Sequence, residues 1–458
     1  SETVVGAAEY YDLTKDKGDA AADMTYEDML AAGVGVEAPD DYTLVFTCKN
    51  PCPYFDTVVA YNSFYPASED LINELGIDGF RSCDYSTMWY NGPYLIEEYI
   101  QQNTKSFIPN PNYYAANDCT RFEHHTITMI PDLSMGLQLY ENGEVDNIDL
   151  TESNLTTITS DTSNAYNDQL CEKRPTKYAY DFHFNFYCLN TDGTPNENWN
   201  KAVANRAFRR CFQEGLNLIP YYARFNKINP LKCENNYYTM KGLCYTSDGK
   251  DYVELVRDAM GMKKEDGKTP ARLDKAKAEQ YKKQAMEELS AQGVTFPVQA
   301  DYYILASSQT ALDSANVLKQ VFSDSFGDDF IQLNIKTYIK SLRQEVVQAH
   351  LQSFVNNGWG ADYGDPQNFL GQELYGYDNA DYSTHYSYIN EVEENESTKE
   401  LLETYKTFTK MVEEADAITN DMDARYAAYA KAEAYMLDHV LVLPCDYEIG
   451  WALSKIDN

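Results

Sequence analysis

The chain has 458 residues, of which 72 are acidic and 37 are basic, so its formal net charge is −35. A field of that sign repels phosphate backbones and anionic lipid head groups, which argues against nucleic-acid binding. No run of about 18 apolar residues occurs, so no segment is expected to span a membrane, and the length exceeds what one hydrophobic core supports.

The first half of the chain predicts antiparallel strands and one long helix. A turn at 39–41 leads into a strand, and a hairpin is expected over 91–108. The segment 125–130 alternates polar and apolar residues, as a half-buried strand should. Apolar residues at near-helical spacing predict a helix over 196–216.

The middle of the chain predicts a polar excursion and then a strand–helix–strand unit. Lys, Asp, Glu and Gly dominate 245–283, which reads as a surface segment that leads into a helix over 273–290. An apolar strand at 298–305 follows, then a helix capped by Ser307 or Ser308 and a strand beginning at Ile331.

The last part of the chain predicts three helices, a loop and a strand. The first helix is expected over 341–354, and the glycines and Asp-Pro of 358–366 force a loop after it. Two late helices follow, and a strand over 439–443 should end at Pro444. The element order as a whole predicts an α/β chain of more than one domain.

The ten cysteines suggest an oxidising compartment. No C-x-x-C occurs and no His stands at zinc-finger spacing, so disulfides in an exported protein are favoured over metal sites. Cys233 and Cys244 flank a polar segment, interpreted as a surface loop, and are predicted to form a disulfide. The alternative is buried free thiols, which behave as small hydrophobes.

Catalytic and cofactor motifs are missing from the sequence. There is no G-x-S-x-G, H-E-x-x-H, Walker loop or complete G-x-G-x-x-G, so no cofactor and no metal are predicted. His124 and His125 are adjacent, and in a strand they would point to opposite faces. Asp362 and Asp365 leave a glycosidase carboxylate pair open as a weak alternative.

Several motifs, in order along the chain, resemble one family. The segment GWGADYGDPQNFL, 358–370, closely resembles the G-W-x-A-D-Y-x-D/E-P-x-x-F-L segment of the oligopeptide-binding proteins, which belong to family 5 of the extracellular solute-binding proteins. Further segments resemble other parts of that family in the same order: 35–47, 91–99, 109–114, 135–150, 196–218 and 380–388. The 358–370 segment is the most specific of them.

The resemblance implies an α/β, two-lobed periplasmic-binding-protein-like fold of type II, cluster C, with the remnant of an extra domain. The remnant would be 1–62, the first lobe 63–230 together with 448–458, and the second lobe 231–447. The implied function is capture of oligopeptides by lobe closure and delivery to the membrane permease of an ABC importer. The implied protein is a monomer outside the cell, anchored by an N-terminal lipid absent from this chain, or periplasmic.

The resemblance also implies the ligand contacts. Asp362 would receive the α-ammonium of the peptide, the backbone of Gly358 and Gly360 would line it, and Trp359 would wall a pocket. A Cys is often found at the position of Gly360, so the bridge it makes is missing here. The strand containing Asn185 and Tyr187 is similar to an aromatic strand that borders the cleft.

The C-terminal strand departs from the family pattern. Glu448 stands where some members have a cleft tyrosine, and the adjacent Tyr447 is therefore the expected contact. Two alternatives stay open: the same fold binding an oligosaccharide, and a secreted hydrolase. The chain is also expected to be incomplete at its N-terminus and C-terminus, because the family's opening and closing strands have no counterpart here.

Overall fold

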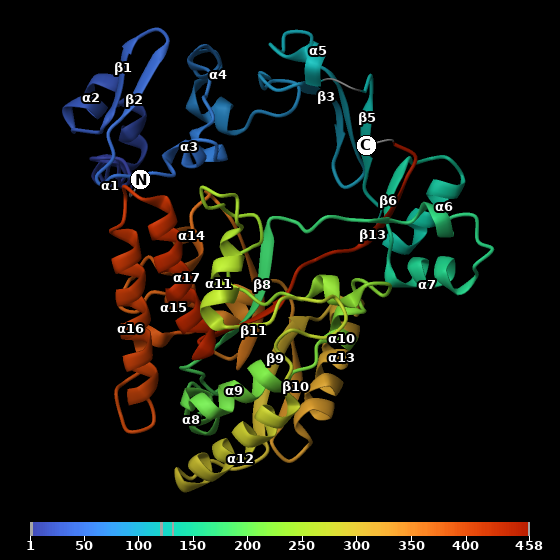
Figure 1. Cartoon of the computed structure of the whole chain (residues 1–458). Coiled ribbons are helices and arrows are strands. Elements are labelled where there is room, and N and C mark those ends of the chain that lie inside the picture. Colours follow the sequence, from blue (N-terminus) through green and yellow to red (C-terminus); the bar gives the residue numbers. More distant parts are fainter. Residues whose placement is uncertain (1–2, 120–121, 131, 457–458) are drawn as a thin grey trace. The chain divides into compact units, whose positions relative to one another are not determined.

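The structure is a computed structural model that describes residues 3–119, 122–130 and 132–456 (Figure 1). The contacts divide the chain into two compact units, Ser1–Gly136 and Leu137–Asn458, each described here by itself. The predicted domain ranges 1–62 and 448–458 include terminal residues that lie outside the described part, and the boundaries at 62, 230 and 447 stay predictions. Both units mix helices and strands, as the sequence predicts.

The first unit contains two small antiparallel sheets and short helices. The turn lies at Asp41 and Tyr42, later than the predicted 39–41, because Pro39 and Asp40 belong to β1; a hairpin of β1 and β2 forms where a single strand was expected. The predicted hairpin over 91–108 is confirmed as β3 and β4, and β5 adds to β4. The elements of this unit are α1 (Ala7–Lys17), α2 (Tyr26–Ala31), β1 (Val36–Asp40), β2 (Thr43–Phe46), α3 (Phe55–Val58), α4 (Glu69–Arg81), β3 (Tyr94–Ile100), β4 (Thr104–Pro109), α5 (Ala116–Cys119) and β5 (His125–Thr128).

The second unit begins with a small three-stranded sheet. Its order is β6-β13-β7, so the last strand of the chain lies between two early strands. A small apolar cluster that includes Tyr140, Ile158 and Leu453 supports it. The elements here are α6 (Gly136–Glu141), β6 (Asn147–Asp149), α7 (Glu152–Ser160), β7 (Cys171–Glu172) and β13 (Trp451–Ser454).

The central sheet of the second unit has the order β11-β8-β12, with both outer strands antiparallel to β8. β8 (Tyr178–Phe184) and β12 (Val442–Asp446) are buried along most of their length, and β11 runs over Phe354–Gly360. The predicted strand at 439–443 is therefore shifted, and Pro444 lies within it. An edge strand accepts proline because the missing N–H is not needed by a further neighbour.

The predicted strand–helix–strand unit is confirmed. β9 (Val298–Leu305) and β10 (Ile331–Tyr338) pair in parallel, and α13 (Gln309–Phe326) packs against them. The hydroxyl oxygen of Ser308 accepts a hydrogen bond from the backbone N–H of Ala311 at 3.2 Å, which makes Ser308 the N-cap. The remaining helices are α8 (Glu197–Ala204), α9 (Arg206–Gly215), α10 (Ile219–Tyr222), α11 (Tyr252–Met260), α12 (Lys275–Ala291), α14 (Gln367–Leu370), α15 (Asp381–His385), α16 (Lys399–Asp416) and α17 (Met422–Asp438).

Two helix predictions and one loop prediction need correction. The helix expected over 196–216 is two helices, because Asn205 has an extended backbone and caps α9 through its side chain. The helix expected over 341–354 is only a π-helical turn, Arg343–Val347. The segment after it is strand β11, so 358–360 is paired backbone and the predicted loop begins at Ala361. β-sheet pairing with β8 overrides the local glycine signal.

The segment interpreted as a polar surface is partly core. Within 245–283, α11 packs on α17 and buries Tyr252, Val253 and Val256. The segment between Cys233 and Cys244 is also buried, because the backbone N–H groups of Tyr238 and Thr239 donate to Glu433 at 2.9 and 3.1 Å.

The predicted disulfide is wrong, since the structure has Cys233 and Cys244 as buried free thiols. Cys233 donates to the backbone oxygen of Ile449 at 3.6 Å, and burial raises the pKa of its thiol to about 12. The alternative of buried thiols applies to this pair. The side chain of Cys119, another of the ten cysteines, lies outside the described residues.

Candidate functional site: the end of strand β11 and the loop after it

Two tyrosine rings lie across the glycines at the end of β11. In the pairing with β8, Gly358 is opposite Tyr180 and Gly360 is opposite Tyr178. A Cβ atom on Gly358 would come within 2.7 Å of the Tyr180 ring, and one on Gly360 within 2.6 Å of the Tyr178 ring. Such distances are not tolerated, so the two glycines are required by the close approach of the rings.

The outer side of β11 has no partner strand in its sheet. β11 is an edge strand of the β11-β8-β12 sheet among the described residues, while β12 lies at the opposite edge. Backbone N–H and C=O groups on an open edge can pair with an added extended segment. The half of β11 that ends at Gly360 therefore offers a template for an extended ligand.

Asn368 fixes the start of the loop that follows β11. Its side-chain oxygen accepts a hydrogen bond from the indole N–H of Trp359 at 3.0 Å and another from the backbone N–H of Asp362 at 2.9 Å. The Trp359 ring also meets Tyr382 edge-on, with 6.0 Å between the centroids. Asn368 is buried, so one amide holds both the tryptophan and the aspartate backbone in place.

Asp362 itself is half-buried, and its carboxylate is available. Within the described residues, no donor is hydrogen bonded to either of its carboxylate oxygens, and no basic group forms an ion pair with it. A carboxylate in that position can accept a charge-assisted hydrogen bond from an ammonium group of a ligand.

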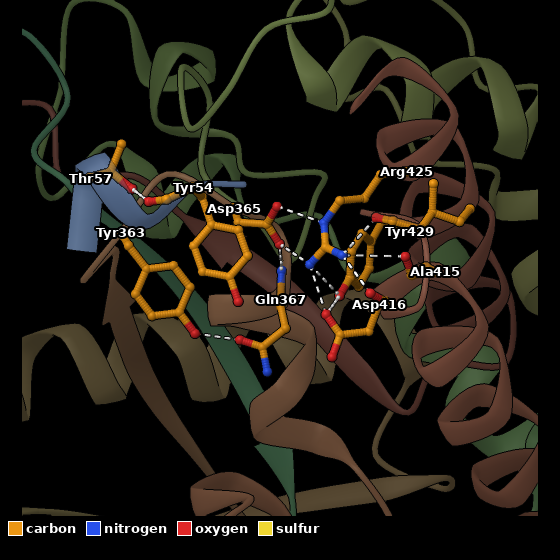
Figure 2. A network of polar contacts seen from close by, with 10 residues as sticks. Tyr54, Thr57, Tyr363, Asp365, Gln367, Ala415, Asp416, Arg425 and Tyr429 are labelled. Carbon is orange, nitrogen blue, oxygen red and sulfur yellow. Dashed lines mark hydrogen bonds and ion pairs between the residues drawn. The ribbon is translucent and has the colours of Figure 1, made fainter. Parts of the chain in front are cut away.

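The carboxylate of Asp365, three residues after Asp362, is paired with the protein instead of being available to a ligand (Figure 2). Its two carboxylate oxygens accept hydrogen bonds from Nε and Nη2 of Arg425, each at 2.9 Å, and the side chains are 0% and 1% exposed. Arg425 also donates to Asp416 at 2.8 Å, and Tyr429 donates to the same carboxylate at 3.0 Å. The inner side of the loop is thereby tied to helices α16 and α17.

The network removes one alternative use of these aspartates. A glycosidase needs two carboxyl groups that both reach the substrate. Asp365 is fully buried and both of its oxygens are taken by Arg425, so it cannot be the partner of Asp362 in such a pair.

The remaining predicted contacts lie elsewhere. Asn185 is 0% exposed, and its amide donates to the backbone oxygens of His350 and Gln352 at 3.1 and 2.9 Å. Tyr187 follows the far end of β8, and Phe184 is six residues, or about 20 Å of strand, from Tyr178. Tyr447 is buried and lines a separate pocket that none of the other predicted residues lines.

Sequence reasoning missed the residues that shape this site. Tyr178 and Tyr180 lie in the first half of β8, a strand whose pairing with β11 no local pattern specifies. Burial, followed by the charge of Glu448, raises the pKa of the Tyr180 phenol. Arg425 is 60 residues from Asp365 in sequence. No pattern within one element could have revealed these contacts.

Neither a metal centre nor a membrane span is found in the described part of the chain. No group of three or more His, Cys, Asp or Glu side chains there could hold a metal ion. None of the helices in the described ranges combines the length and apolar character needed to cross a bilayer.

Comparison with known proteins decides the family. The family model of the bacterial extracellular solute-binding proteins, family 5 (middle region), matches residues 6–381. The chain belongs to this family. The resemblance inferred from the motif at 358–370 is thus confirmed.

Curated relatives cover most of this family 5 chain. It is 24% identical to the oligopeptide-binding protein SarA of Streptococcus gordonii over 453 residues, 93% of this chain and 66% of SarA. It is 25% identical to the oligopeptide-binding protein AliB of Streptococcus pneumoniae over 454 residues, 90% of this chain and 65% of AliB. The chain spans just under two thirds of the length of these relatives, which are named as binding proteins.

Solved structures of binding proteins share the fold. Listeria monocytogenes OppA bound to peptide superposes with a TM-score of 0.63 at 20% identity, covering 98% of this chain and 76% of that one. The substrate-binding domain of an oligopeptide ABC transporter from Bacillus anthracis gives a TM-score of 0.63 at 17% identity, covering 97% and 76%. The expected α/β fold of family 5 binding proteins is confirmed.

Proposed function

We propose that this chain is the ligand-capturing part of an extracellular subunit of an ABC importer, that it binds oligopeptides, and that it catalyses no reaction. The protein acts as a monomer, closes on its ligand and delivers it to the membrane permease. It is held at the outer face of the membrane by an N-terminal lipid, or is periplasmic. Membership of family 5 and the names of SarA and AliB support this proposal.

One observation carries the choice of peptide as ligand: an open strand edge ends beside an available carboxylate. A peptide brings unpaired N–H and C=O groups that are costly to bury alone, and strand addition to β11 would pair them. Asp362, just after the strand, would receive the α-ammonium and fix the register. A neutral sugar has no ammonium group to pair with the charge and no row of amide groups to pair with the edge.

The proposed contacts are the backbone of Gly358 and Gly360, the ring of Trp359 and the carboxylate of Asp362. Tyr178 and Tyr180 would supply flat surfaces beside the peptide. We leave Asn185 out of this set because its amide is buried and already bonded to the protein. Tyr187 and Tyr447 stay predicted contacts, and Tyr447 lines a separate pocket.

Calorimetry with a free peptide and its N-acetylated form, on the parent and on Asp362→Asn, tests the proposal. Either change alone should weaken binding by about two to three decades, because each removes one desolvated charge pair. Both together should weaken it little further, since both delete the same interaction.

An oligosaccharide titration is the control. If acetylation is harmless to the parent, or if a sugar binds and peptides do not, the peptide proposal is wrong. Asp362 would then be a turn residue in a binding protein whose ligand is not a free peptide.

A further inference from the structure

A basic pocket lies in the second unit, apart from the site around Asp362. It has a volume of about 850 Å³, within the range of pockets that hold drug-sized ligands. Its walls include the segment just after β7 and the segment between β12 and β13. These two segments connect the small β6-β13-β7 sheet with the central sheet.

The charge of the pocket is opposite to that of the chain. Acidic residues outnumber basic ones about two to one in the whole sequence, yet the pocket lining has five basic side chains against three acidic ones. The basic side chains are Lys173, Arg174, Lys232, Lys241 and Lys268. Such a local reversal concentrates anions against the repulsion of the rest of the surface.

Part of this positive charge is not neutralised by the protein. Lys241 pairs with Glu265 at 2.8 Å, and Lys232 pairs with Glu172. Arg174 and Lys268 are exposed and have no ion pair within the described residues. The third acid, Glu234, is buried, accepts from the backbone N–H of Ala271 at 3.0 Å, and has its pKa raised by burial.

The pocket also offers apolar surface. Tyr447 borders it but is 2% exposed, and its hydroxyl is buried, so that hydroxyl is not presented to a ligand in the pocket. Ile228, 40% exposed, Leu231 and Ile449 add apolar surface to the lining.

We propose that this pocket binds an organic anion with an apolar body, its carboxylate held by Arg174 and Lys268. The guanidinium and ammonium groups neutralise the carboxylate, and the isoleucines and leucine cover the body of the ligand. This site is distinct from the one around Asp362, which does not line the pocket.

Calorimetry of the full chain at fixed ionic strength tests this, with 4-phenylbutyrate and its neutral amide as probes. The anion should bind saturably, and the amide at least about tenfold more weakly. The double variant Arg174→Gln with Lys268→Gln should weaken binding of the anion at least about tenfold. Lys263→Gln with Lys264→Gln is the matched control, because it removes the same charge from exposed residues outside the lining and should leave affinity unchanged.

One further variant separates this pocket from the proposed peptide site. Asp362→Asn should not change the affinity for the anion. No saturable binding up to about 10 mM, equal affinity for anion and amide, or an equal loss in the control pair overturns the proposal. A loss of affinity for the anion in Asp362→Asn would place the anion in the peptide site, and would overturn the proposal as well.

Discussion

The two sides of the loop after β11 use the same residue type for opposite purposes. Asp365, on the inner side, is fully buried and gives both oxygens to Arg425. Asp362, on the outer side, is half-buried, and its carboxylate has no protein partner within the described residues. The inner aspartate is part of the scaffold, and the outer one is left for a ligand.

The difference shows how a binding loop can be rigid without being occupied. Asn368 fixes the backbone of Asp362, and the Asp365–Arg425 pair fixes the loop from within. A ligand that meets a pre-positioned carboxylate loses less free energy in ordering the site. The basic pocket beside Tyr447 is built differently, because its charges sit on exposed side chains.

The largest effect is expected from removing the inner cation. Arg425→Met should lower the free energy of unfolding by about 3–5 kcal/mol, because Asp365 would remain buried without its partner. Urea or thermal unfolding measures the change. Lys431→Met is the control, since Lys431 lies on the same helix α17 but is exposed, and a change within about 0.5 kcal/mol is expected.

A loss below about 1 kcal/mol for Arg425→Met would show that Asp365 can be protonated or hydrated at little cost. The loop would then owe its shape to Asn368 alone, and the contrast between its two sides would disappear.

The next effect is a pH dependence from Asp446 in β12. Burial raises its pKa to about 6, and only the amide of Asn356, at 3.3 Å, and the adjacent Cys445 counteract it. The folded state therefore holds a proton between about pH 4 and pH 6 that the unfolded state has released. Stability contributed by Asp446 is present below this window and is lost as the pH rises through it.

Asp446→Asn removes that dependence. The unfolding free energy of the parent minus that of the variant should fall by on the order of 3 kcal/mol between pH 3.5 and pH 7. Denaturant unfolding at several pH values measures the difference. A difference that stays constant, or that increases with pH, would show that Asp446 is ionised in the folded protein throughout.

A smaller effect is expected where the tyrosine rings lie on β11. Gly358→Ala should cost about 1–3 kcal/mol, because the new methyl would meet the Tyr180 ring. Gly450→Ala is the matched control, since nothing lies within 4 Å of its Cβ position. Equal stability of the two variants would show that the Tyr180 ring moves freely.

Much of the fold follows from local pattern, because it is held by local contacts. The β9–α13–β10 unit, the hairpin of β3 and β4, and the last two long helices follow their own local sequence patterns. β11 does not, because its glycines are explained only by rings on β8, more than 170 residues earlier. The same holds for the buried segment before Cys244, which Glu433 organises from α17.

The site was predictable only in part for the same reason. The motif at 358–370 marks Asp362, Trp359 and the two glycines through the family resemblance, but the residue types alone do not distinguish Asp362 from Asp365. Their roles are separated by Arg425, which lies on a helix with no local signal for a buried cation. The basic pocket also depends on segments far apart in sequence, so composition, which is strongly acidic, conceals it.

The smallest expected change in stability, from Asp362→Asn, is the sharpest test of the comparison. Asparagine keeps the shape and loses the charge, and the backbone N–H of Asp362 would still donate to Asn368. Since no described residue is bonded to the carboxylate, the free energy of unfolding should change by at most about 0.5 kcal/mol. Unfolding by urea without ligand measures this, beside Asp365→Asn, which should lose several times more because Arg425 is left buried and underpaired.

The same unfolding experiment repeated with a saturating free peptide completes the comparison. The parent should gain stability in proportion to the logarithm of the peptide concentration above its Kd, and Asp362→Asn should gain much less at the same concentration. If Asp362→Asn instead loses stability without ligand, its carboxylate supports the fold and both sides of the loop are scaffold. If it is as stable as the parent and gains equally from peptide, the ammonium of the ligand is held by another group.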